Sequence, residues 1–380
     1  MDLSLDLELA LADLRELVEC ESPSTDLAAV ARSADVVARI GTERLGVAPE
    51  RIVLDGRTHL RWRLGDGPAR VLVLGHHDTV WPVGTLATHP FGIEGDVLRG
   101  PGCFDMLAGL VMAFHALSGL ELVGGVTLLV TGDEELGSPS SRELVEDEAR
   151  GLDAALVLEA SAGGALKTER KGVSLYEVVV RGRAAHAGLE PEAGVNATLE
   201  LAHQALAVAA LGDAKAGTTV TPTLARAGTT TNTVPAGGSF AVDVRVRSTA
   251  EQDRVDEAMR ALRPVLDGAV VSVLGGPNRP PLEGSSSAEL LARARAVAVR
   301  LGLPEPTAVA VGGASDGNFT AGVGTPTLDG LGAAGGGAHA DDEHVLVSEL
   351  PGRTALLRGL VEDLLAQPTN RLQTTGAARP

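Results

Sequence analysis

Residues 71–78 read Val-Leu-Val-Leu-Gly-His-His-Asp, an apolar run that ends abruptly in polar side chains. Two later runs, 126–130 and 154–158, are also short and rich in Val and Leu. The segments between the runs are long enough to hold helices. Continuous apolar runs of this length are typical of strands covered on both faces. Strands that alternate with helices form a parallel sheet. We therefore predict an α/β domain with a mostly parallel sheet and helices on both of its faces.

Helical periodicity surrounds these predicted strands. Leu, Val, Ala and Ile recur at three- and four-residue spacing over residues 7–18 and 27–45, and a further helix is expected around 290–301. The apolar stretch 106–120 is too short to cross a membrane and carries His115 in its middle. We interpret that stretch as a buried helix.

From about residue 172 the pattern changes to that of a second domain. Strand-like and helix-like segments follow one another in the order β-α-β-β-α-β, over residues 174–181, 195–210, 219–225, 239–246, 251–262 and 269–273. This order is that of the ferredoxin-like split unit.

After residue 280 the pattern of the first domain resumes, with a predicted helix and further apolar runs. We therefore predict one domain in two parts, residues 1–171 and 281–367, with a ferredoxin-like α+β domain, residues 172–280, inserted between them. Residues 368–380 have no periodicity and are expected to form a disordered tail.

Composition narrows the classes of partner. Fifty acidic against 32 basic residues give a formal net charge of −18, which repels phosphate backbones and anionic lipid headgroups. The chain has five Phe, two Trp and one Tyr, too few aromatic rings for a base-stacking surface. We expect a small-molecule substrate and no nucleic-acid or membrane partner. Two cysteines, and the absence of a secretory-signal pattern in residues 1–8, favour a cytoplasmic location.

Side chains that bind metals follow each of the three predicted strands. They are His76, His77 and Asp78 after the first, Asp133, Glu134 and Glu135 after the second, and Glu159 after the third. In an open parallel sheet, ligands bind in the crevice at the carboxyl ends of the strands. Two further candidates are Asp105, which ends a glycine-bounded turn before an apolar helix, and His339, which follows the glycine-rich stretch 332–337.

Two histidines and three acids exceed the ligands that one catalytic zinc ion needs. They match two metal ions about 3.5–4 Å apart that share one carboxylate. Mixed imidazole and carboxylate ligands favour two Zn²⁺ ions per chain, with Mn²⁺ or Co²⁺ as tolerated substitutes. Such a site also needs a carboxylate that accepts a proton from water instead of binding metal. The adjacent pair Glu134 and Glu135 offers one acid for each role.

Five short motifs occur in register along nearly the whole chain: His76-x-Asp78-Thr-Val, Gly100-Pro-Gly-x-x-Asp105, Asp133-Glu134-Glu135-x-Gly137-Ser138, Leu158-Glu159 and Ala338-His339. Together with the predicted inserted domain, they resemble the di-zinc metallopeptidase family of glutamate carboxypeptidases, acetylornithine deacetylase, succinyl-diaminopimelate desuccinylase and aminoacylases. Leu-Glu-Ala-Ser at 158–161 and the inserted-domain motifs are most similar to the glutamate carboxypeptidase branch.

The resemblance implies a ligand set for each zinc ion. One ion is bound by His76, Asp105 and Glu159, and the other by Asp105, Glu135 and His339, so that Asp105 bridges the two.

The resemblance also implies two supporting acids. Glu134 matches the general base, and Asp78 matches an acid that orients the imidazole of His76. The family tends to hold a cis peptide after the bridging aspartate, so the Asp105–Met106 bond is expected to be cis. Leu107 departs from the pattern, because many members carry lysine there.

The inserted domain carries further matches. Arg183-Ala-Ala-His186-Ala-Gly188 resembles the family segment whose histidine reaches the active site of the partner subunit and stabilises an oxyanion, which implies a homodimer formed through this domain. Asn232 and Arg245 lie in segments that resemble the substrate-binding region, where the arginine pairs with the substrate carboxylate.

Two matches remain. Lys167 corresponds to a secondary cation of the glutamate-releasing branch, and Gly312 and Gly313 resemble a loop that lines the pocket.

The sequence therefore predicts a hydrolase that cleaves an amide bond next to a free carboxylate. An N-acyl amino acid deacylase, of the acetylornithine deacetylase or aminoacylase type, is the alternative enzyme. A non-catalytic, metal-dependent binding protein with the same fold is the alternative from another class. Its mark would be the loss of Glu134 or Asp105, and both residues are present.

Overall fold

The computed structural model describes residues 5–65, 67–120 and 125–367, which form two compact units. Unit 1 takes its described residues from Met1–Thr168, Gly284–Ala310 and Ser315–Pro380, and unit 2 consists of Glu169–Glu283 and Val311–Ala314. The first four residues and the predicted tail 368–380 lie outside the described residues.

A six-stranded sheet forms the centre of unit 1. Its strands, in spatial order, are β1 (Glu50–Leu54), β2 (Arg57–Leu64), β6 (Val126–Thr131), β3 (Val71–His76), β7 (Ala154–Val157) and β16 (Thr327–Leu328). The neighbours from β6 to β16 pair in parallel, and the hairpin β1–β2 pairs antiparallel at one edge. The predicted mostly parallel sheet is confirmed, with an antiparallel edge that the sequence analysis did not predict.

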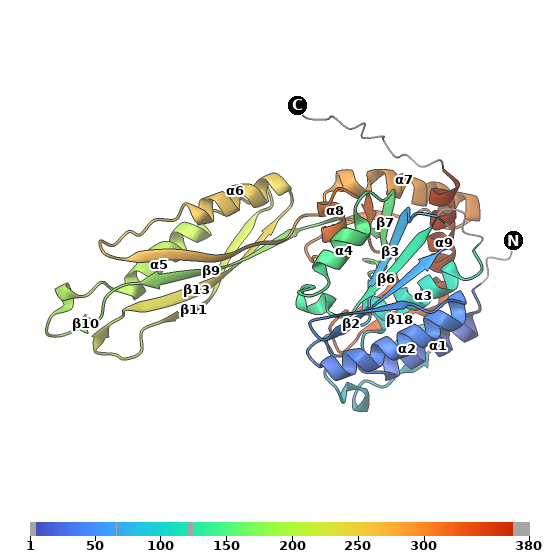
Figure 1. Cartoon of the computed structure of the whole chain (residues 1–380), viewed down its shortest axis with the longest axis horizontal. Coiled ribbons are helices and arrows are strands. Elements are labelled where there is room, and N and C mark those ends of the chain that lie inside the picture. The colour runs from blue at the N-terminus through green and yellow to red at the C-terminus, as the bar shows by residue number, and fades with distance from the viewer. Residues whose placement is uncertain (1–4, 66, 121–124, 368–380) are drawn as a thin grey trace. The chain divides into compact units, whose positions relative to one another are not determined.

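Helices cover both faces of this sheet. Alternate side chains of its strands point to opposite faces, and both sets are buried in β3 and β6. Val71 and Val73 belong to a core shared with α1 (Leu7–Glu19), α2 (Leu27–Leu45), α3 (Ala108–Leu117), α7 (Gly284–Leu301) and α9 (Leu350–Ala366). Leu72 and Leu74 pack instead with residues of α4 (Arg142–Ala149) and α8 (Gly317–Gly322). Figure 1 shows α4 and α8 on one side of β3 and β6, and α3 and α9 on the other.

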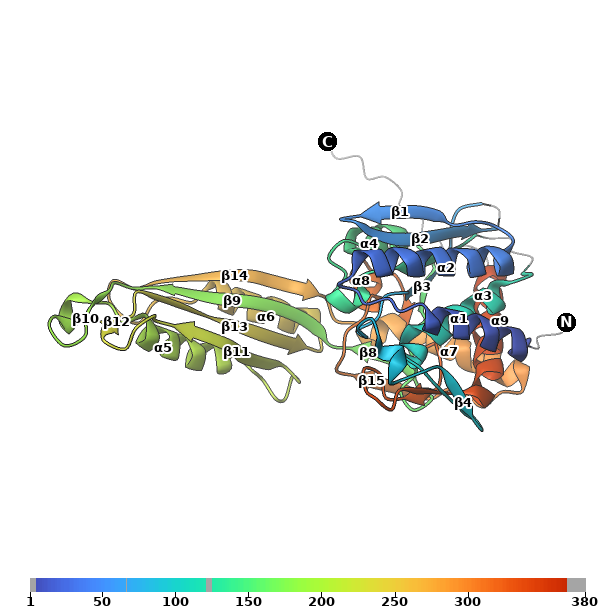
Figure 2. The same cartoon turned by 90° about the horizontal axis from the view of Figure 1, so that it is seen from below.

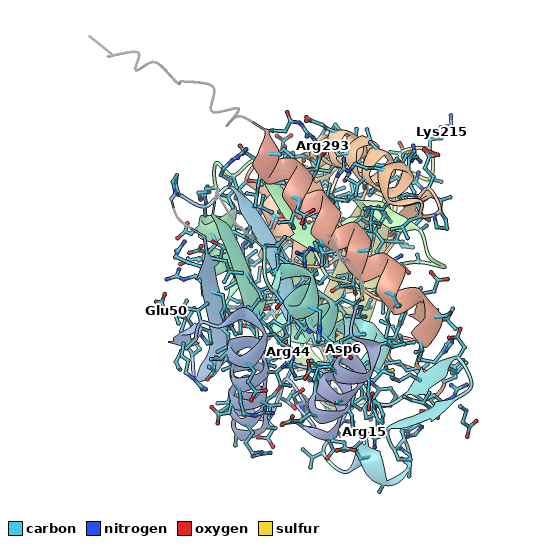
Figure 3. All side chains as sticks on the ribbon, turned by 90° about the vertical axis from the view of Figure 1, so that its right-hand side faces the viewer. Asp6, Arg15, Arg44, Glu50, Lys215 and Arg293 are labelled. Carbon is cyan, nitrogen blue, oxygen red and sulfur yellow. The ribbon has the colours of Figure 1, made fainter. Side chains whose placement is uncertain are left out.

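Helices α1 and α2 each begin at a capping aspartate, and an ion pair connects them. The Asp6 and Asp26 carboxylates accept hydrogen bonds from backbone N–H groups in the first turns of α1 and α2. Arg44 of α2, labelled in Figure 3, forms an ion pair with the buried Asp13 of α1 at 2.6 Å. His115 of α3 lies 2.9 Å from the same carboxylate. The three helices therefore share one buried polar contact.

A small antiparallel sheet, absent from the sequence analysis, positions the segment around residue 339. Its strands in spatial order are β17 (Gly335–Gly336), β18 (His344–Leu346), β5 (Val97–Arg99) and β4 (Gly92–Glu94). Because β18 pairs with β5, the loop between β17 and β18 lies beside the turn that follows β5. The two segments are more than 230 residues apart in the chain.

Unit 2 has the predicted order of elements. In chain order they are β9 (Gly172–Arg181), α5 (Ala197–Ala209), β11 (Thr219–Ala227), β13 (Gly237–Val246), α6 (Thr249–Arg260) and β14 (Val270–Arg279), with the short strands β10 (Ala185–His186) and β12 (Thr233–Val234) as a separate pair. The four long strands pair antiparallel in the order β11-β13-β9-β14. Both helices cover one face, where Val178, Phe240 and Val242 form the core (Figure 2).

Helix α3 packs closely against the sheet, and this contact sets the position of the turn before it. The helix is buried along its length, and none of the described helices meets the length and hydropathy of a membrane span. A Cβ atom on Gly109 would lie 2.3 Å from the carbonyl oxygen of Leu158, closer than non-bonded atoms can approach. Gly109 therefore permits the contact between α3 and the end of β7.

We expect Gly109→Ala to destabilise unit 1 by about 1–3 kcal/mol, because the added methyl group forces α3 away from the sheet. Urea denaturation followed by tryptophan fluorescence measures this, since both tryptophans, Trp62 and Trp81, lie in unit 1. Gly352→Ala in α9 is the matched control. Its Cβ would lie 3.6 Å from the nearest atom, so the substitution should be neutral or stabilising by up to about 1 kcal/mol. Equal stability of the two variants would contradict the close contact.

Candidate active site

Two triads of metal-binding side chains meet in unit 1. Ligand atoms of His76, Asp105 and Glu159 lie within 4.8 Å of one another, and so do those of Asp105, Glu135 and His339. Asp105 is common to both triads. The structure thus brings together the five residues for which the sequence predicts metal binding, in two groups with one shared carboxylate.

The parallel sheet positions three of the five. His76 is the last residue of β3, whose neighbours are β6 and β7. Glu135 follows the end of β6 within a 3-10 turn, and Glu159 lies two residues beyond β7. All three are therefore at the carboxyl edge of the sheet, where parallel strands converge on ligands.

Asp105 comes from a tight turn at the start of α3. Gly102 has a left-handed backbone with φ 72°, and Met106 has φ 81° and ψ −45°. The expected cis peptide after Asp105 is wrong: the Asp105–Met106 bond is trans. The chain turns here through the positive φ of Met106. A positive φ at a methionine is itself strained, and such strain is typical of functional sites.

His339 lies in the loop between β17 and β18 and has φ 64°. Its Nε2 atom is 2.6 Å from Asp105 Oδ2 and 3.2 Å from Glu135 Oε1. The imidazole is half exposed, so this side of the cluster is open to solvent. One nitrogen atom thus faces both carboxylates of the second triad.

Asp78 forms hydrogen bonds to the backbone next to two residues of the cluster. Its buried carboxylate accepts hydrogen bonds from the backbone N–H groups of Glu134 and Glu135, both at 3.2 Å. The Nδ1 atom of His76 lies 2.9 Å from the Asp78 carbonyl oxygen and 3.5 Å from its Oδ1. Donation from Nδ1 leaves the lone pair of His76 Nε2 on the side of Glu159, 3.7 Å away. This is the arrangement of a metal-binding histidine with a supporting carboxylate.

The pKa values of the candidate ligands are shifted because several acids lie close together. Hydrogen bonds to Asp105 and Glu135 raise the pKa of His339 to about 10. Burial lowers the pKa of His76, but its contacts with Asp78 and Glu159 outweigh burial and raise that pKa well above the usual value. Burial, together with the charge of Asp105, raises the pKa of Glu135. Without a metal, protonated imidazoles neutralise the acids; a cation bound by these imidazole and carboxylate donors would do the same, and this donor set fits zinc.

Lys167 of β8 (Leu166–Arg170) borders the first triad. Its Nζ atom lies 3.9 Å from Glu159 Oε2, and its side chain is mostly buried. The predicted secondary cation is thus adjacent to a candidate ligand.

The other predicted site residues belong to unit 2. His186 is in β10, and its Nδ1 accepts hydrogen bonds from the N–H groups of Gly188 and Leu189, both at 3.1 Å. Arg245 in β13 forms a two-bond contact with Asp243 at 2.8 and 2.9 Å. The carbonyl of Asn232 accepts from the N–H of Ala187, and that of Gly313, which follows Gly312, accepts from the guanidinium of Arg170.

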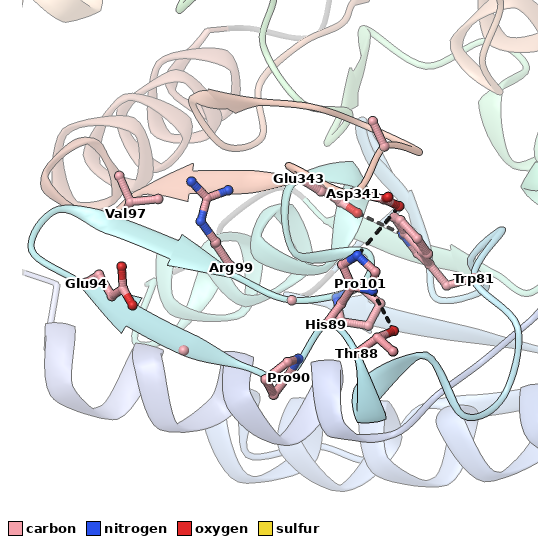
Figure 4. Close-up of a pocket in the computed structure, with 13 residues that line it drawn as sticks. Trp81, Thr88, His89, Pro90, Glu94, Val97, Arg99, Pro101, Asp341 and Glu343 are labelled. Carbon is pink, nitrogen blue, oxygen red and sulfur yellow. Dashed lines mark hydrogen bonds and ion pairs between the residues drawn. The ribbon is translucent and has the colours of Figure 1, made fainter.

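One residue of the site has no role in the sequence analysis. The buried carboxylate of Glu343 contacts the turn that carries Asp105 and also lines a pocket of about 420 Å³ with Trp81, His89 and Arg99 (Figure 4). The only signal in the sequence is its place four residues after His339, in the acidic run 341–343. That run is equally typical of a solvated loop.

Comparisons with known proteins agree with this geometry. The model of peptidase family M20/M25/M40 matches residues 72–363. The chain is 33% identical over 316 residues to carboxypeptidase G2 from Pseudomonas sp. (strain RS-16), covering 79% of this chain and 75% of that protein. It is 28% identical over 349 residues to succinyl-diaminopimelate desuccinylase from Dechloromonas aromatica (strain RCB), covering 84% and 90%.

A solved structure shares the fold. An M20 family metallo-carboxypeptidase from Sulfolobus solfataricus has a TM-score of 0.72 at 17% identity, over 94% of this chain and 99% of that one. The predicted family is confirmed, and that family is metal-dependent, typically on zinc. This chain belongs to peptidase family M20/M25/M40 and is an enzyme of the zinc peptidase and amidohydrolase kind.

Proposed function

We propose that this enzyme is a di-zinc hydrolase that cleaves an amide bond next to a free carboxylate, as a glutamate carboxypeptidase does. The observation that carries the proposal is the pair of candidate ligand triads that share Asp105, with Glu134 preceding Glu135 in the sequence. The similarity to carboxypeptidase G2 supports the choice of substrate class.

Each zinc ion takes one triad in this proposal. His76, Asp105 and Glu159 would hold the first ion, and Asp105, Glu135 and His339 would hold the second. When bound, such ions supply Lewis acidity, which polarises a carbonyl group and lowers the pKa of water.

Glu134 acts as the general base. It lies in the 3-10 turn Glu134–Leu136 at the end of β6, and 9% of the residue is exposed. Its backbone N–H is held by Asp78, so its side chain extends from a fixed point. Glu134 accepts a proton from the attacking water and transfers it to the leaving nitrogen. Asp78 remains ionised, because its contact with His76 outweighs burial and lowers its pKa.

His186 stabilises the oxyanion from the partner subunit of a homodimer. Its Nδ1 accepts two backbone N–H groups, so the neutral ring carries its proton on Nε2. An Nε2–H donor on an exposed strand suits an oxyanion that forms in another active site. The inserted domain supplies the dimer contact in this proposal.

The resemblance to the family supplies the proposed substrate contacts. Arg245 pairs with the substrate carboxylate through the N–H groups that do not bind Asp243, and Asn232 binds the same end of the substrate. Lys167 adds positive charge beside Glu159, and Gly312 and Gly313 line the pocket. We also propose a cytoplasmic location, which the two free cysteines support.

A second candidate is an N-acyl amino acid deacylase. The similarity to succinyl-diaminopimelate desuccinylase, which extends over 90% of that protein, favours it. Both reactions break an amide beside a carboxylate, so they share the chemistry above and differ in the side-chain pocket. A non-catalytic binding protein is disfavoured, because Glu134 and Asp105 are both present.

A substrate panel separates the two enzymes. We expect the zinc-loaded protein to hydrolyse dipeptides with C-terminal glutamate faster than those with C-terminal neutral residues, and faster than N-acetyl or N-succinyl amino acids, because the proposed carboxylate contacts match a released glutamate. Release of free amino groups measures each rate. A preference for the N-acyl amino acids would identify the deacylase instead.

Glu134→Gln tests the mechanism within the same assay. We expect it to retain both zinc ions and to lose at least about 100-fold in kcat, because the amide cannot accept the proton. Glu143→Gln, an exposed acid in α4, is the matched control and should leave kcat unchanged. Near-native turnover by Glu134→Gln would reject its role as base.

Zinc affinity should depend on pH. Because the pKa of His339 is about 10, this residue is protonated at pH 7 in the metal-free protein, and zinc must displace the proton. We expect affinity, measured by competition with a chromophoric chelator, to rise about tenfold per pH unit for each displaced proton between pH 6 and 8. His339→Ala should bind one zinc ion fewer, and His203→Ala, an exposed histidine in α5, should bind as the wild type does. A pH-independent affinity would argue against this ligand.

The role of His186 predicts complementation between inactive subunits. His186→Ala should lower kcat by about 100- to 1,000-fold without loss of zinc, because an oxyanion donor is removed. In a random mixture of His186→Ala and Glu134→Gln subunits, half of the sites in each mixed dimer regain an intact pair. Co-expression should therefore restore about a quarter of the wild-type activity. Activity no higher than that of the separate variants would show that His186 does not act across the dimer.

A further inference from the structure

We propose that Glu343 is a positioning residue that fastens the loop of His339 to the turn of Asp105. These are the two ligand-carrying segments that do not follow a strand of the parallel sheet. The inference rests on the proposed function, because the two segments are defined by the ligands assigned there. Glu343 itself is placed outside the ligand set.

Both carboxylate oxygens of Glu343 are occupied by donors from other parts of the chain. Oε1 accepts the backbone N–H groups of Phe104 at 3.0 Å and of Asp105 at 2.9 Å. Oε2 accepts the N–H of Gly102 at 3.0 Å and the indole Nε1–H of Trp81 at 2.8 Å. Figure 4 shows the carboxylate directed at the indole of Trp81. Glu343 is 4% exposed, so water competes little for these four bonds.

The turn around Asp105 is built to receive an anion. Gly102 has φ 72°, and this left-handed residue lets the N–H groups of residues 102, 104 and 105 converge on one point. Converging backbone N–H groups form an anion-binding concavity. Here the anion is a side chain of the same protein, supplied from a segment 238 residues away.

The contact closes a ring that contains two proposed ligands. The backbone N–H of Asp105 binds Glu343, and the carboxylate of Asp105 faces His339 Nε2 at 2.6 Å. The ring returns from His339 to Glu343 through a compact loop, in which the N–H of Ala340 binds the carbonyl of Gly337 and the N–H of Glu343 binds that of Ala340. Glu343 therefore fixes the distance between the Asp105 backbone and the His339 loop.

Within the described ranges, no lysine, arginine or histidine forms an ion pair with Glu343, whose partners are the N–H groups of the turn and of Trp81. Four N–H dipoles hold it in place of a cation. A carboxylate kept buried on this arrangement is costly unless every donor is present. This specificity distinguishes Glu343 from an acid that merely fills space, because a neutral isostere cannot bind the same donors.

Glu343→Gln makes that isosteric change. A glutamine amide has one oxygen and one NH₂ group, so in either orientation two of the four donors face another donor. We expect the affinity for at least one of the two zinc ions to fall by about 10- to 100-fold, measured by chelator competition on the full-length protein. The visible absorption spectrum of the Co²⁺-loaded variant should also change, because the geometry of Asp105 and His339 changes.

Glu200→Gln is the matched control for a purely structural effect. Glu200 is also fully buried and accepts the N–H groups of Val265 and Leu266, but it lies in unit 2. We expect this variant to lose thermal stability while its zinc affinity and Co²⁺ spectrum match the wild type. A Glu343→Gln variant that folds and binds both ions with wild-type affinity would overturn the proposal.

Trp81→Phe covers the case in which Glu343→Gln does not fold. It removes the indole donor and leaves the three backbone donors, so we expect a smaller loss of zinc affinity, about two- to fivefold. Unchanged affinity in Trp81→Phe, with Glu343→Gln unfolded, would also overturn the proposal. The substrate panel on the wild type tests the proposed reaction separately. Weaker zinc binding by Glu343→Gln would stand even if that panel gave no turnover.

Discussion

The site depends on one kind of interaction, a buried carboxylate that accepts backbone N–H groups from a turn carrying a proposed metal ligand. Asp78 holds the N–H groups of Glu134 and Glu135, and Glu343 holds those of Phe104 and Asp105. Hydrogen bonds to an ionised acceptor are in general stronger than those between neutral groups. The two acids thereby fix turns that strand pairing alone leaves free, since these turns begin where the strands end.

The same two acids explain how a cluster of like charges is held together. The carboxylates of Asp105, Glu135 and Glu159 converge at the edge of the sheet, and repulsion among them favours any rearrangement that separates them. Hydrogen bonds to Asp105 and Glu135 accordingly raise the pKa of His339 to about 10. Backbone bonds to Asp78 and Glu343 oppose the rearrangement, because their strength does not depend on the charge of the ligands. The cluster is therefore organised before a cation binds.

Much of this arrangement could be predicted from the sequence, because β3, β6 and β7 are apolar runs that are followed by the polar side chains of the candidate site. The hairpin β1–β2 was missed because β2 has no continuous apolar run: Thr58 and His59 are both polar, and apolar and polar residues alternate only over residues 60–64. The sheet of β4, β5, β17 and β18 has strands of two or three residues, too short for periodicity to detect. The role of Glu343 was missed because its partners are mostly backbone N–H groups, which every residue type except proline carries.

Leu107 shows how a departure from the family pattern fits this organisation. The resemblance implies lysine at this position in many members, but Leu107 is buried in the core of unit 1. Its side chain lies against Gly102, where an added Cβ would be 3.3 Å from the Leu107 Cδ1 atom. The turn of Asp105 is thus packed by an apolar side chain on one side and bound by Glu343 on the other. A lysine ammonium would be desolvated in the position that Leu107 occupies. In this chain, apolar packing by Leu107 therefore takes the place of a charge next to the Asp105 turn.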